Sequence, residues 1–324
     1  MNRILVTGGA GFIGSHMVDS LVRDQMEVCV VDNFDSFYNR GIKESNISGA
    51  LQSGFCRLVE ADIANVEQMK PIFAEWQPNL VIHLAAKAGV RPSVEQPQRY
   101  IETNVNGTAN ILDLSVAHQV KKVIFASSSS VYGLNKKVPF TEDDPLLLPA
   151  SPYGATKIAG EALCQSYSNC YGLPIVALRF FTVYGPRQRP DLAIHSFSRK
   201  ILGGEPISMF GDGQTCRDYT YVTDIVTGIC AAMSVPIQGF EVCNLGNDQP
   251  VKLIDLIHSI EEAVGKKAII HQLPAQVGDV PATWASLDKA SRLLQYRPQT
   301  SLQVGLNHFI HWLRSSGLYE EVSY

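Results

Sequence analysis

Short apolar runs, each bounded by turn residues, recur along most of the chain. Runs bracketed in this way by glycine, proline and polar residues are typical of buried strands. The strands predicted from them are Arg3–Thr7, Glu27–Asp32, Phe55–Glu60, Leu80–Leu84, Lys122–Ala126, Pro174–Phe180 and Phe240–Leu245.

Between the strands lie stretches in which apolar residues recur at helical spacing. The predicted helices are Phe12–Arg23, Val66–Trp76, Tyr100–His118 and Pro152–Tyr171, with later ones near Thr223–Met233, Leu253–Val264 and Leu302–Leu313. Alternating buried strands and helices predict a parallel sheet that is covered on both faces. We therefore expect an α/β protein built on a Rossmann-type, doubly wound parallel sheet.

The alternation stops after Arg179, where pairs such as Gly185-Pro186 and Gly203-Gly204 interrupt the chain. A chain of 324 residues exceeds what one hydrophobic core usually organises, so a smaller lobe is expected beside the sheet. We predict a main domain of residues 1–180 plus about 218–249, and a smaller C-terminal lobe of residues 181–217 and 250–324.

Composition and charge narrow the choice of partners. Charged residues make up 18% of the sequence and the formal net charge is −4, so no basic field for nucleic acid is expected. No apolar run reaches about 18 residues, and no secretory leader is visible, so we expect a cytoplasmic protein without a membrane span. The seven cysteines are scattered without a Cys-x-x-Cys pair, which favours reduced thiols over disulfides and predicts no metal site.

A glycine-rich loop follows the first predicted strand and opens the first helix. Gly8, Gly11 and Gly14 stand in a Gly-x-x-Gly-x-x-Gly spacing. Glycines here allow a tight turn and a close backbone approach to a pyrophosphate, whose charge is favoured at a helix N-terminus. The loop therefore predicts a dinucleotide site.

The second strand ends in Asp32, at the position where an acid accepts hydrogen bonds from the adenosine ribose. A 2′-phosphate would lie against this negative charge, and no arginine stands immediately beside Asp32, so we predict NAD rather than NADP as the cofactor. Asp62 ends the third strand in the same way. It is expected either to hold the adenine or to be an ordinary strand-end aspartate.

Tyr153 and Lys157 stand four residues apart at the start of a predicted helix, and so on one face of it. A tyrosine has a pKa of about 10 in water, and an adjacent ammonium and an oxidised nicotinamide would favour its phenolate. Upstream, the serine run from Ser127 to Ser130 follows a strand, at the edge where open parallel sheets bind ligands. This constellation predicts a proton-abstracting site.

Together with His83-Leu-Ala-Ala86, these motifs resemble the extended short-chain dehydrogenase/reductase family over almost the whole chain. The later segments beginning at Arg179 and Phe210 resemble its nucleotide-sugar epimerases. The resemblance implies that Tyr153 is the acid/base, that Lys157 tunes it, and that Ser128 and Ser129 orient a sugar hydroxyl. NAD would take hydride from C4 and return it to the other face, with no net redox change.

The motif positions and the resemblance together imply a set of NAD contacts and a substrate-binding C-terminal lobe. The expected NAD contacts are Gly8, Gly11, Phe12, Ile13, Gly14, Asp32, Asn33, Asp62, Ile63, Leu84, Ala85, Ala86, Lys87, Asn104, Ser127, Tyr153, Lys157 and Phe180. The expected UDP-sugar contacts are Arg91, Ser128, Ser129, Thr182, Arg189, Arg217 and Asp279.

Within the family, the segments Ala88–Arg91 and Phe181–Ala193 look like those of UDP-glucuronate 4-epimerases. Arg189 offers a planar fork suited to a carboxylate, and Thr182 can donate its hydroxyl. We expect these two residues, with Arg91, to hold the carboxylate of a 4-keto intermediate so that it does not lose carbon dioxide. Arg217 is expected to grip the UDP phosphates and Asp279 to approach the uridine ribose.

Other functions stay open at this point. A UDP-glucose 4-epimerase or a UDP-glucuronate decarboxylase would use the same hydride cycle. A sensor or scaffold that keeps the NAD fold without the chemistry is a further alternative, disfavoured because both Tyr153 and Lys157 are present. The helices Tyr100–His118 and Pro152–Tyr171 carry apolar residues on more than one face, and in relatives such helices pair across a two-fold axis, so we expect a homodimer.

Overall fold

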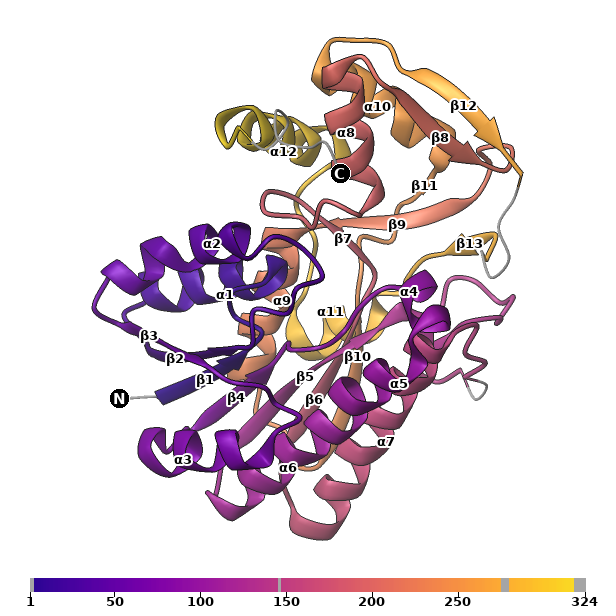
Figure 1. Cartoon of the computed structure of the whole chain (residues 1–324). Helices are drawn as coiled ribbons and strands as arrows, with labels where there is room; N and C mark the ends of the chain where they lie inside the picture. Colours follow the sequence, from indigo (N-terminus) through magenta and orange to yellow (C-terminus); the bar gives the residue numbers. More distant parts are fainter. Residues whose placement is uncertain (1–2, 145–146, 275–279, 318–324) are drawn as a thin grey trace.

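The computed structural model describes residues 3–144, 147–274 and 280–317. Its centre is a seven-stranded, all-parallel sheet in the order β10-β6-β5-β4-β1-β2-β3 (Figure 1). The strands are β1 (Arg3–Thr7), β2 (Glu27–Asp32), β3 (Cys56–Glu60), β4 (Leu80–His83), β5 (Lys122–Ser128), β6 (Ile175–Phe180) and β10 (Phe240–Leu245). The doubly wound α/β fold is confirmed, and every predicted strand lies in this sheet.

Helices cover both faces of the sheet, which explains why its strands are apolar on both sides. One face carries α1 (Phe12–Arg23), α2 (Arg40–Gln52) and α9 (Val222–Ser234), and the other carries α3 (Val66–Trp76), α6 (Gly107–Ala117) and α7 (Pro152–Tyr171) (Figure 1). Alternate residues of β1 divide between the two cores, since Ile4 and Val6 join the first and Leu5 joins the second. The strand order reverses between β1 and β4, and the carboxyl ends of the strands at such a point are where open α/β sheets bind ligands.

The prediction of one continuous α-helix over Tyr100–His118 is wrong, because a π-helical turn interrupts it. The segment consists of α5 (Pro97–Ile101), a π-helical turn η1 (Glu102–Asn106), and α6. The π-helical turn contains Asn104, whose side chain is buried and donates hydrogen bonds to the Lys87 carbonyl at 2.9 Å and to Thr156 Oγ1 at 3.0 Å. Such turns widen a helix locally and are frequent at functional sites.

The C-terminal part of the chain adds a smaller group of elements above the sheet edge (Figure 1). One small sheet joins β11 (Pro250–Lys252), β9 (Cys216–Tyr221) and β13 (Ala282–Thr283), with β7 (Thr182–Tyr184) also paired to β9. A second pairs β8 (Pro206–Phe210) with β12 (Ile269–Leu273). Helices α8 (Ala193–Gly203), α10 (Leu253–Val264) and α12 (Leu302–Ser315) pack on one another and share a continuous core with α1 and α9.

Several elements were not predicted from the sequence. They are α2, α8, the short helices α4 (Val90–Glu95) and α11 (Asp288–Leu294), the 3₁₀ turn η2 (Ser129–Val131), and the small strands β7, β8, β9, β11, β12 and β13. Helix α2 has few apolar residues, so its periodicity is weak. It begins instead at a cap, where the Asn39 side chain accepts a hydrogen bond from the Gly41 amide at 2.7 Å.

Over the ranges that the structure covers, no helix is long and apolar enough to cross a membrane. Within those same ranges, no group of three or more His, Cys, Asp or Glu side chains is arranged to hold a metal ion. All seven cysteines are free thiols.

Candidate active site

The glycine-rich loop joins β1 to α1 with an open helix N-terminus. Gly8 has a φ of +71°, and a Cβ there would lie 2.8 Å from the Ala85 backbone. A Cβ at Gly14 would collide with the Gly8 carbonyl oxygen. Gly11 stands at the N-cap position of α1 but has no side chain that could accept a hydrogen bond from the first helical amides, such as those of Phe12 and Ile13. This arrangement fits a pyrophosphate, because backbone donors and the helix dipole both favour an anion there.

Asp32 lies at the carboxyl end of β2 with each carboxylate oxygen already holding one backbone donor. The Ala10 amide donates at 3.1 Å and the Phe34 amide at 2.9 Å. Burial raises the pKa of Asp32, while the Lys43 ammonium and these two hydrogen bonds oppose the rise. The remaining lone pairs can accept the two ribose hydroxyls that the sequence assigns to this position.

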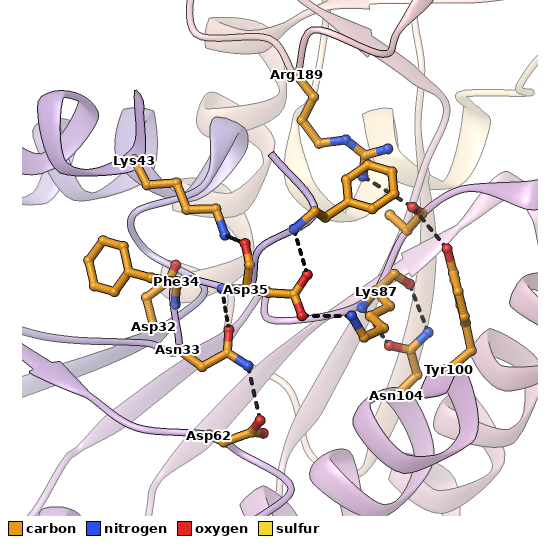
Figure 2. A network of polar contacts seen from close by, with 12 residues as sticks. Asp32, Asn33, Phe34, Asp35, Lys43, Asp62, Lys87, Tyr100, Asn104 and Arg189 are labelled. Atoms are coloured by element: carbon orange, nitrogen blue, oxygen red, sulfur yellow. Dashed lines mark hydrogen bonds and ion pairs between the residues drawn. The ribbon is translucent and has the colours of Figure 1, made fainter. Parts of the chain in front are cut away.

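Lys43 is a site residue that the sequence analysis missed. Its side chain is buried, and its ammonium donates to the Asp35 carbonyl at 2.8 Å (Figure 2). Burial lowers the pKa of Lys43, and the Asp32 and Asp35 carboxylates oppose that change. No signal in the sequence marked this lysine, because α2 was not predicted and its packing against α1 and β3 positions Lys43 near Asp32.

Two further carboxylates organise the loops on this edge of the sheet (Figure 2). Asn33 donates to Asp62 at 3.0 Å, which joins the loops after β2 and β3. Asp35 pairs with the Lys87 ammonium at 2.7 Å, which joins the loops after β2 and β4. Lys87 is in turn fixed by its backbone, since its amide donates to Asn104 Oδ1 at 2.8 Å. The predicted cofactor residues Asn33, Asp62, Lys87 and Asn104 therefore lie along one rim.

A buried hydrogen-bonded chain lies below that rim. Thr7 Oγ1 lies 2.7 Å from His83 Nδ1, and His83 Nε2 lies 3.0 Å from Thr108 Oγ1. Thr108 donates to the Asn104 carbonyl at 2.6 Å, so its oxygen accepts from His83 Nε2–H, and Nδ1 accepts from Thr7. Burial, with a smaller contribution from Lys157, lowers the pKa of His83 to about 3. His83 is thus a neutral imidazole that joins the end of β1 to α6.

Tyr153 and Lys157 lie in the first turns of α7, which begins at a Ser151 cap that accepts from the Gly154 amide at 3.2 Å. The Lys157 ammonium is buried, lies 6.0 Å from the centre of the Tyr153 ring, and donates to the Ala126 carbonyl at 2.7 Å. Burial lowers the pKa of Lys157 to about 8, against opposing effects of Cys164 and Glu161.

The expected lowering of the Tyr153 pKa by Lys157 is not found in the chain alone. Burial raises the pKa of Tyr153, and the opposing effects come from a hydrogen bond with Ser128 and from the Arg189 guanidinium. The reason is geometric, because the Lys157 ammonium is directed at a carbonyl of β5 and not at the phenol. Ser128 and Arg189 are thus the groups of the chain that favour the phenolate.

The four serines after β5 have different surroundings. The Ser127 hydroxyl donates to Glu161 at 2.5 Å, which turns it toward the interior. Ser128 ends β5 and its hydroxyl accepts from the Ser130 amide at 3.1 Å, while Ser129 opens the turn η2. Of these serines, Ser128 is the one that affects the pKa of Tyr153, and it opposes the rise caused by burial.

A buried ion pair lies directly beneath these serines and was also missed by the sequence analysis. Arg179 of β6 donates to both oxygens of Glu161 on α7, from Nε at 2.9 Å and from Nη2 at 2.7 Å. Its Nη1 donates to the Tyr132 hydroxyl at 2.9 Å, which donates to Asn244 on β10 at 2.7 Å. Arg179 is therefore a structural residue of the sheet, although it opens the segment that signalled the sugar site in the sequence.

Arg189 reaches the catalytic edge from the loop between β7 and α8. Its Nη1 donates to the Ala88 carbonyl at 3.2 Å, and its guanidinium lies 4.9 Å from the centre of the Phe37 ring. The Tyr100 hydroxyl donates to the same carbonyl at 3.3 Å (Figure 2). The centre of the Tyr100 ring lies 6.2 Å from that of the Tyr153 ring. The structure thus brings the predicted carboxylate-binding arginine next to the predicted acid/base.

The other predicted substrate residues are spread over the upper elements. Arg91 on α4 has its guanidinium 5.0 Å from the centre of the Phe210 ring at the end of β8. Thr182 begins β7 and is partly buried, while Arg217 on β9 donates to its neighbouring Cys216 carbonyl at 2.8 Å. Asp279 lies outside the described residues.

The remaining predicted cofactor residues follow the strand ends. Leu84, Ala85 and Ala86 come directly after β4, and the Ala85 amide donates to Thr7 Oγ1 at 3.2 Å. Ile63 is buried after β3 and Phe180 is buried at the end of β6. All of them lie at the carboxyl edge of the parallel sheet, which is where open α/β sheets bind their ligands.

Comparisons with known proteins agree with this arrangement. The model of the NAD dependent epimerase/dehydratase family matches residues 4–246. A UDP-glucuronate 4-epimerase of Thermodesulfobacterium geofontis is 39% identical, over 98% of this chain and 97% of the relative.

Two solved structures cover 97% of this chain and 99% of their own. A UDP-glucuronic acid 4-epimerase from Bacillus cereus, in complex with UDP-glucuronic acid and NAD, matches with a TM-score of 0.91 at 37% identity. A UDP-glucose 4-epimerase from Thermotoga maritima, with UDP-glucose, matches with a TM-score of 0.89 at 36% identity.

Proposed function

The chain belongs to the NAD dependent epimerase/dehydratase family, and from this premise we propose that it is a UDP-glucuronate 4-epimerase, which interconverts UDP-glucuronate and UDP-galacturonate. The observation that supports this substrate most directly is the guanidinium of Arg189 beside Tyr153. A positive fork at the acid/base suits a sugar that carries a carboxylate.

The residues at the sheet edge fit NAD. The open N-terminus of α1 suits the pyrophosphate, and Asp32 with the neighbouring Lys43 suits the adenosine ribose. We assign the other NAD contacts to the rim residues Asn33, Asp62, Lys87 and Asn104 and to the strand-end residues described above. When bound, NAD supplies the hydride acceptor and donor at C4 of the sugar.

The chain itself supplies the proton transfer. Tyr153 takes the proton of the C4 hydroxyl as a phenolate and returns it after the sugar has been presented by its other face. Ser128 and Arg189 favour that phenolate, and the positive charge of a bound oxidised nicotinamide would add to their effect. Ser129 is assigned to the sugar hydroxyl beside Ser128.

The carboxylate must be restrained during the reaction, because a 4-keto hexuronate is a β-keto acid. Carbon dioxide is lost readily only when the bond to the carboxylate lies parallel to the π orbitals of the ketone. Hydrogen bonds from Thr182, Arg189 and Arg91 would hold the carboxylate away from that alignment. Retention of this carbon distinguishes an epimerase from a decarboxylase with the same active site.

The rest of the assignment concerns the nucleotide and the assembly. Arg217 is proposed to bind the UDP phosphates and Asp279 the uridine ribose. Residues 181–217 and 250–324 are proposed as the substrate-binding lobe, and residues 1–180 plus about 218–249 as the NAD-binding domain.

We further propose a cytoplasmic homodimer. The seven free cysteines suit a reducing compartment, and α6 and α7 lie side by side as the pairing helices.

A UDP-glucose 4-epimerase is the second candidate, because a solved enzyme of that kind is nearly as similar. The test is to incubate the protein separately with UDP-glucuronate and with UDP-glucose, and to follow sugar products and carbon dioxide by NMR. We expect UDP-galacturonate without carbon dioxide. Turnover of UDP-glucose alone would contradict the carboxylate assignment, and a pentose product would make the protein a decarboxylase.

A further inference from the structure

Arg189 has a carboxylate partner within its own loop. Its Nε donates to Asp191 Oδ1 at 3.0 Å and its Nη2 donates to Asp191 Oδ2 at 2.7 Å. With the bond from Nη1 to the Ala88 carbonyl, three of the five guanidinium N–H donors are engaged. The side chain of Arg189 is 16% exposed and that of Asp191 is 41% exposed.

The pair with Asp191 has the geometry that a substrate carboxylate would also adopt. Two parallel N–H donors facing two carboxylate oxygens form the bidentate arrangement that makes arginine a specific ligand of carboxylates. Asp191 therefore occupies the same fork of Arg189 that the sugar would use, and it does so next to Tyr153.

We propose that Asp191 is a specificity-determining residue, an internal carboxylate that competes with the carboxylate of the sugar for Arg189. The inference rests on the proposed function, because it requires a substrate with a carboxylate. Asp191 offsets part of the positive charge that Arg189 presents, so it weakens binding of UDP-glucuronate relative to UDP-glucose.

Two arrangements of the complex are compatible with this inference, and in both of them Asp191 weakens binding of the charged sugar. In one, Arg189 exchanges Asp191 for the sugar carboxylate, and an existing ion pair must be broken. In the other, the sugar takes the two remaining donors, and two carboxylates then face one guanidinium and repel each other. In either case, removal of the Asp191 charge strengthens binding of the charged sugar.

The effect should fall on binding and not on the chemical step. Substrate and product both carry the carboxylate throughout, so a change at Asp191 alters their binding and that of the transition state alike. A uniform change of this kind alters KM and leaves kcat nearly constant.

The test uses the holoenzyme with Asp191→Asn. The amide keeps one acceptor for Arg189 and removes the charge. We expect the KM for UDP-glucuronate to fall about fivefold, with kcat within about twofold of the wild type. The inhibition constant of UDP-glucose against UDP-glucuronate should stay within about twofold, because a neutral sugar does not compete with Asp191.

Matched variants show whether the effect passes through Arg189. In an Arg189→Gln background, Asp191→Asn should leave the KM for UDP-glucuronate unchanged. Glu75 of α3 forms a surface ion pair with Arg57 of β3, and Glu75→Gln removes one carboxylate charge there. This variant should leave KM, kcat and the inhibition constant unchanged. Asp191→Ser is the second variant, and melting temperatures verify that each protein is folded.

Three results would overturn the inference alone, in a wild-type enzyme that converts UDP-glucuronate. The first is a higher KM for UDP-glucuronate in both Asp191 variants. The second is an equal change in the KM for UDP-glucuronate and in the inhibition constant of UDP-glucose. The third is an effect of Asp191→Asn on KM that is as large in the Arg189→Gln background as in the wild type. Failure of the wild type to convert UDP-glucuronate would overturn the proposed function, and this inference with it.

Discussion

At the scale of single residues, the decisive feature is the environment of Tyr153. A phenol whose pKa is raised by burial is a poor base, and the chain offsets this with a hydrogen bond from Ser128 and the charge of Arg189. Lys157, four residues along α7, is directed to the Ala126 carbonyl instead. The spacing of the motif places Tyr153 and Lys157 on one helix face, whereas their electrostatic surroundings depend on neighbours from other elements.

Tyr153→Phe removes only the hydroxyl that is proposed to transfer the proton. We expect kcat for epimerisation to fall by a factor of about 10² to 10⁴, because a positioned acid/base contributes an acceleration of that order. NAD content, measured from the absorbance of the denatured protein's supernatant, should stay the same. Unchanged conversion in this variant would refute Tyr153 as the acid/base.

At the scale of elements, α7 carries the Tyr153–Lys157 pair and a buried structural ion pair on one of its faces. Tyr153 and Lys157 lie at its start, and Glu161, one turn further, forms the buried pair with Arg179 of β6. This pair joins α7 to β6. Ser127 of β5 also donates to Glu161, so the same carboxylate ties the helix to the strand that precedes the serine turn. The N-terminal half of α7 is therefore fixed by polar contacts inside the fold.

Glu161→Gln would leave the Arg179 charge buried with only neutral partners. Breaking a buried pair from one side typically costs about 3 kcal/mol or more in the free energy of unfolding. Urea denaturation of the variant should show a loss of this order. The surface variant Glu75→Gln is the control and should lose less than about 1 kcal/mol. Equal losses in the two variants would argue against a structural role of the buried pair.

His83 connects three elements as a neutral imidazole, and this predicts a pH dependence of stability. Its pKa is about 3 in the fold against an ordinary value of 6.5, so between these values only the unfolded chain binds the proton. Stability from this group is therefore complete above pH 6.5 and is lost as the pH falls toward 3. At pH 5 the loss is of the order of 2 kcal/mol.

The comparison with His83→Gln isolates this contribution. The variant carries no imidazole at position 83, so its free energy of unfolding should fall less than that of the wild type between pH 7.5 and pH 5. The difference in free energy of unfolding between the wild type and His83→Gln should narrow by about 2 kcal/mol over this pH range. A gap that stays constant over this range would show that His83 does not titrate on unfolding.

At the scale of the whole molecule, the outer face of α7 remains open to a partner. Small side chains at helical spacing line it, and these are Ala155, Ala159, Ala162, Ser166 and Cys170. All but the partly buried Ala159 are exposed. Small residues let helices approach closely, which fits the proposed pairing of α6 and α7 with the same helices of a second copy.

Ala162→Arg places a long charged side chain on this face and should separate the proposed dimer into monomers. Sedimentation at several protein concentrations measures the change. Ala74→Arg, at an exposed position of α3 on a different part of the surface, is the matched control and should keep the assembly of the wild type. A dimer that survives Ala162→Arg would place the interface elsewhere.

The sequence by itself determined the central sheet, most of its helices, the glycine loop, Asp32 and the Tyr153–Lys157 pair. These features are local, because strand and helix periodicity and short motifs are written in consecutive residues. Helix α2 and the small strands of the C-terminal part escaped prediction since their apolar pattern is weak and their stability comes from packing on distant segments.

Only the tertiary structure decided which side chains meet. It brought Lys43 to Asp32, paired Glu161 with Arg179, placed Asn104 in a π-helical turn against Lys87, and set Arg189 with Asp191 beside Tyr153. Each of these contacts joins elements far apart in the sequence or depends on burial. The charge and pKa of a group follow from such neighbours, and no pattern within one segment contains them.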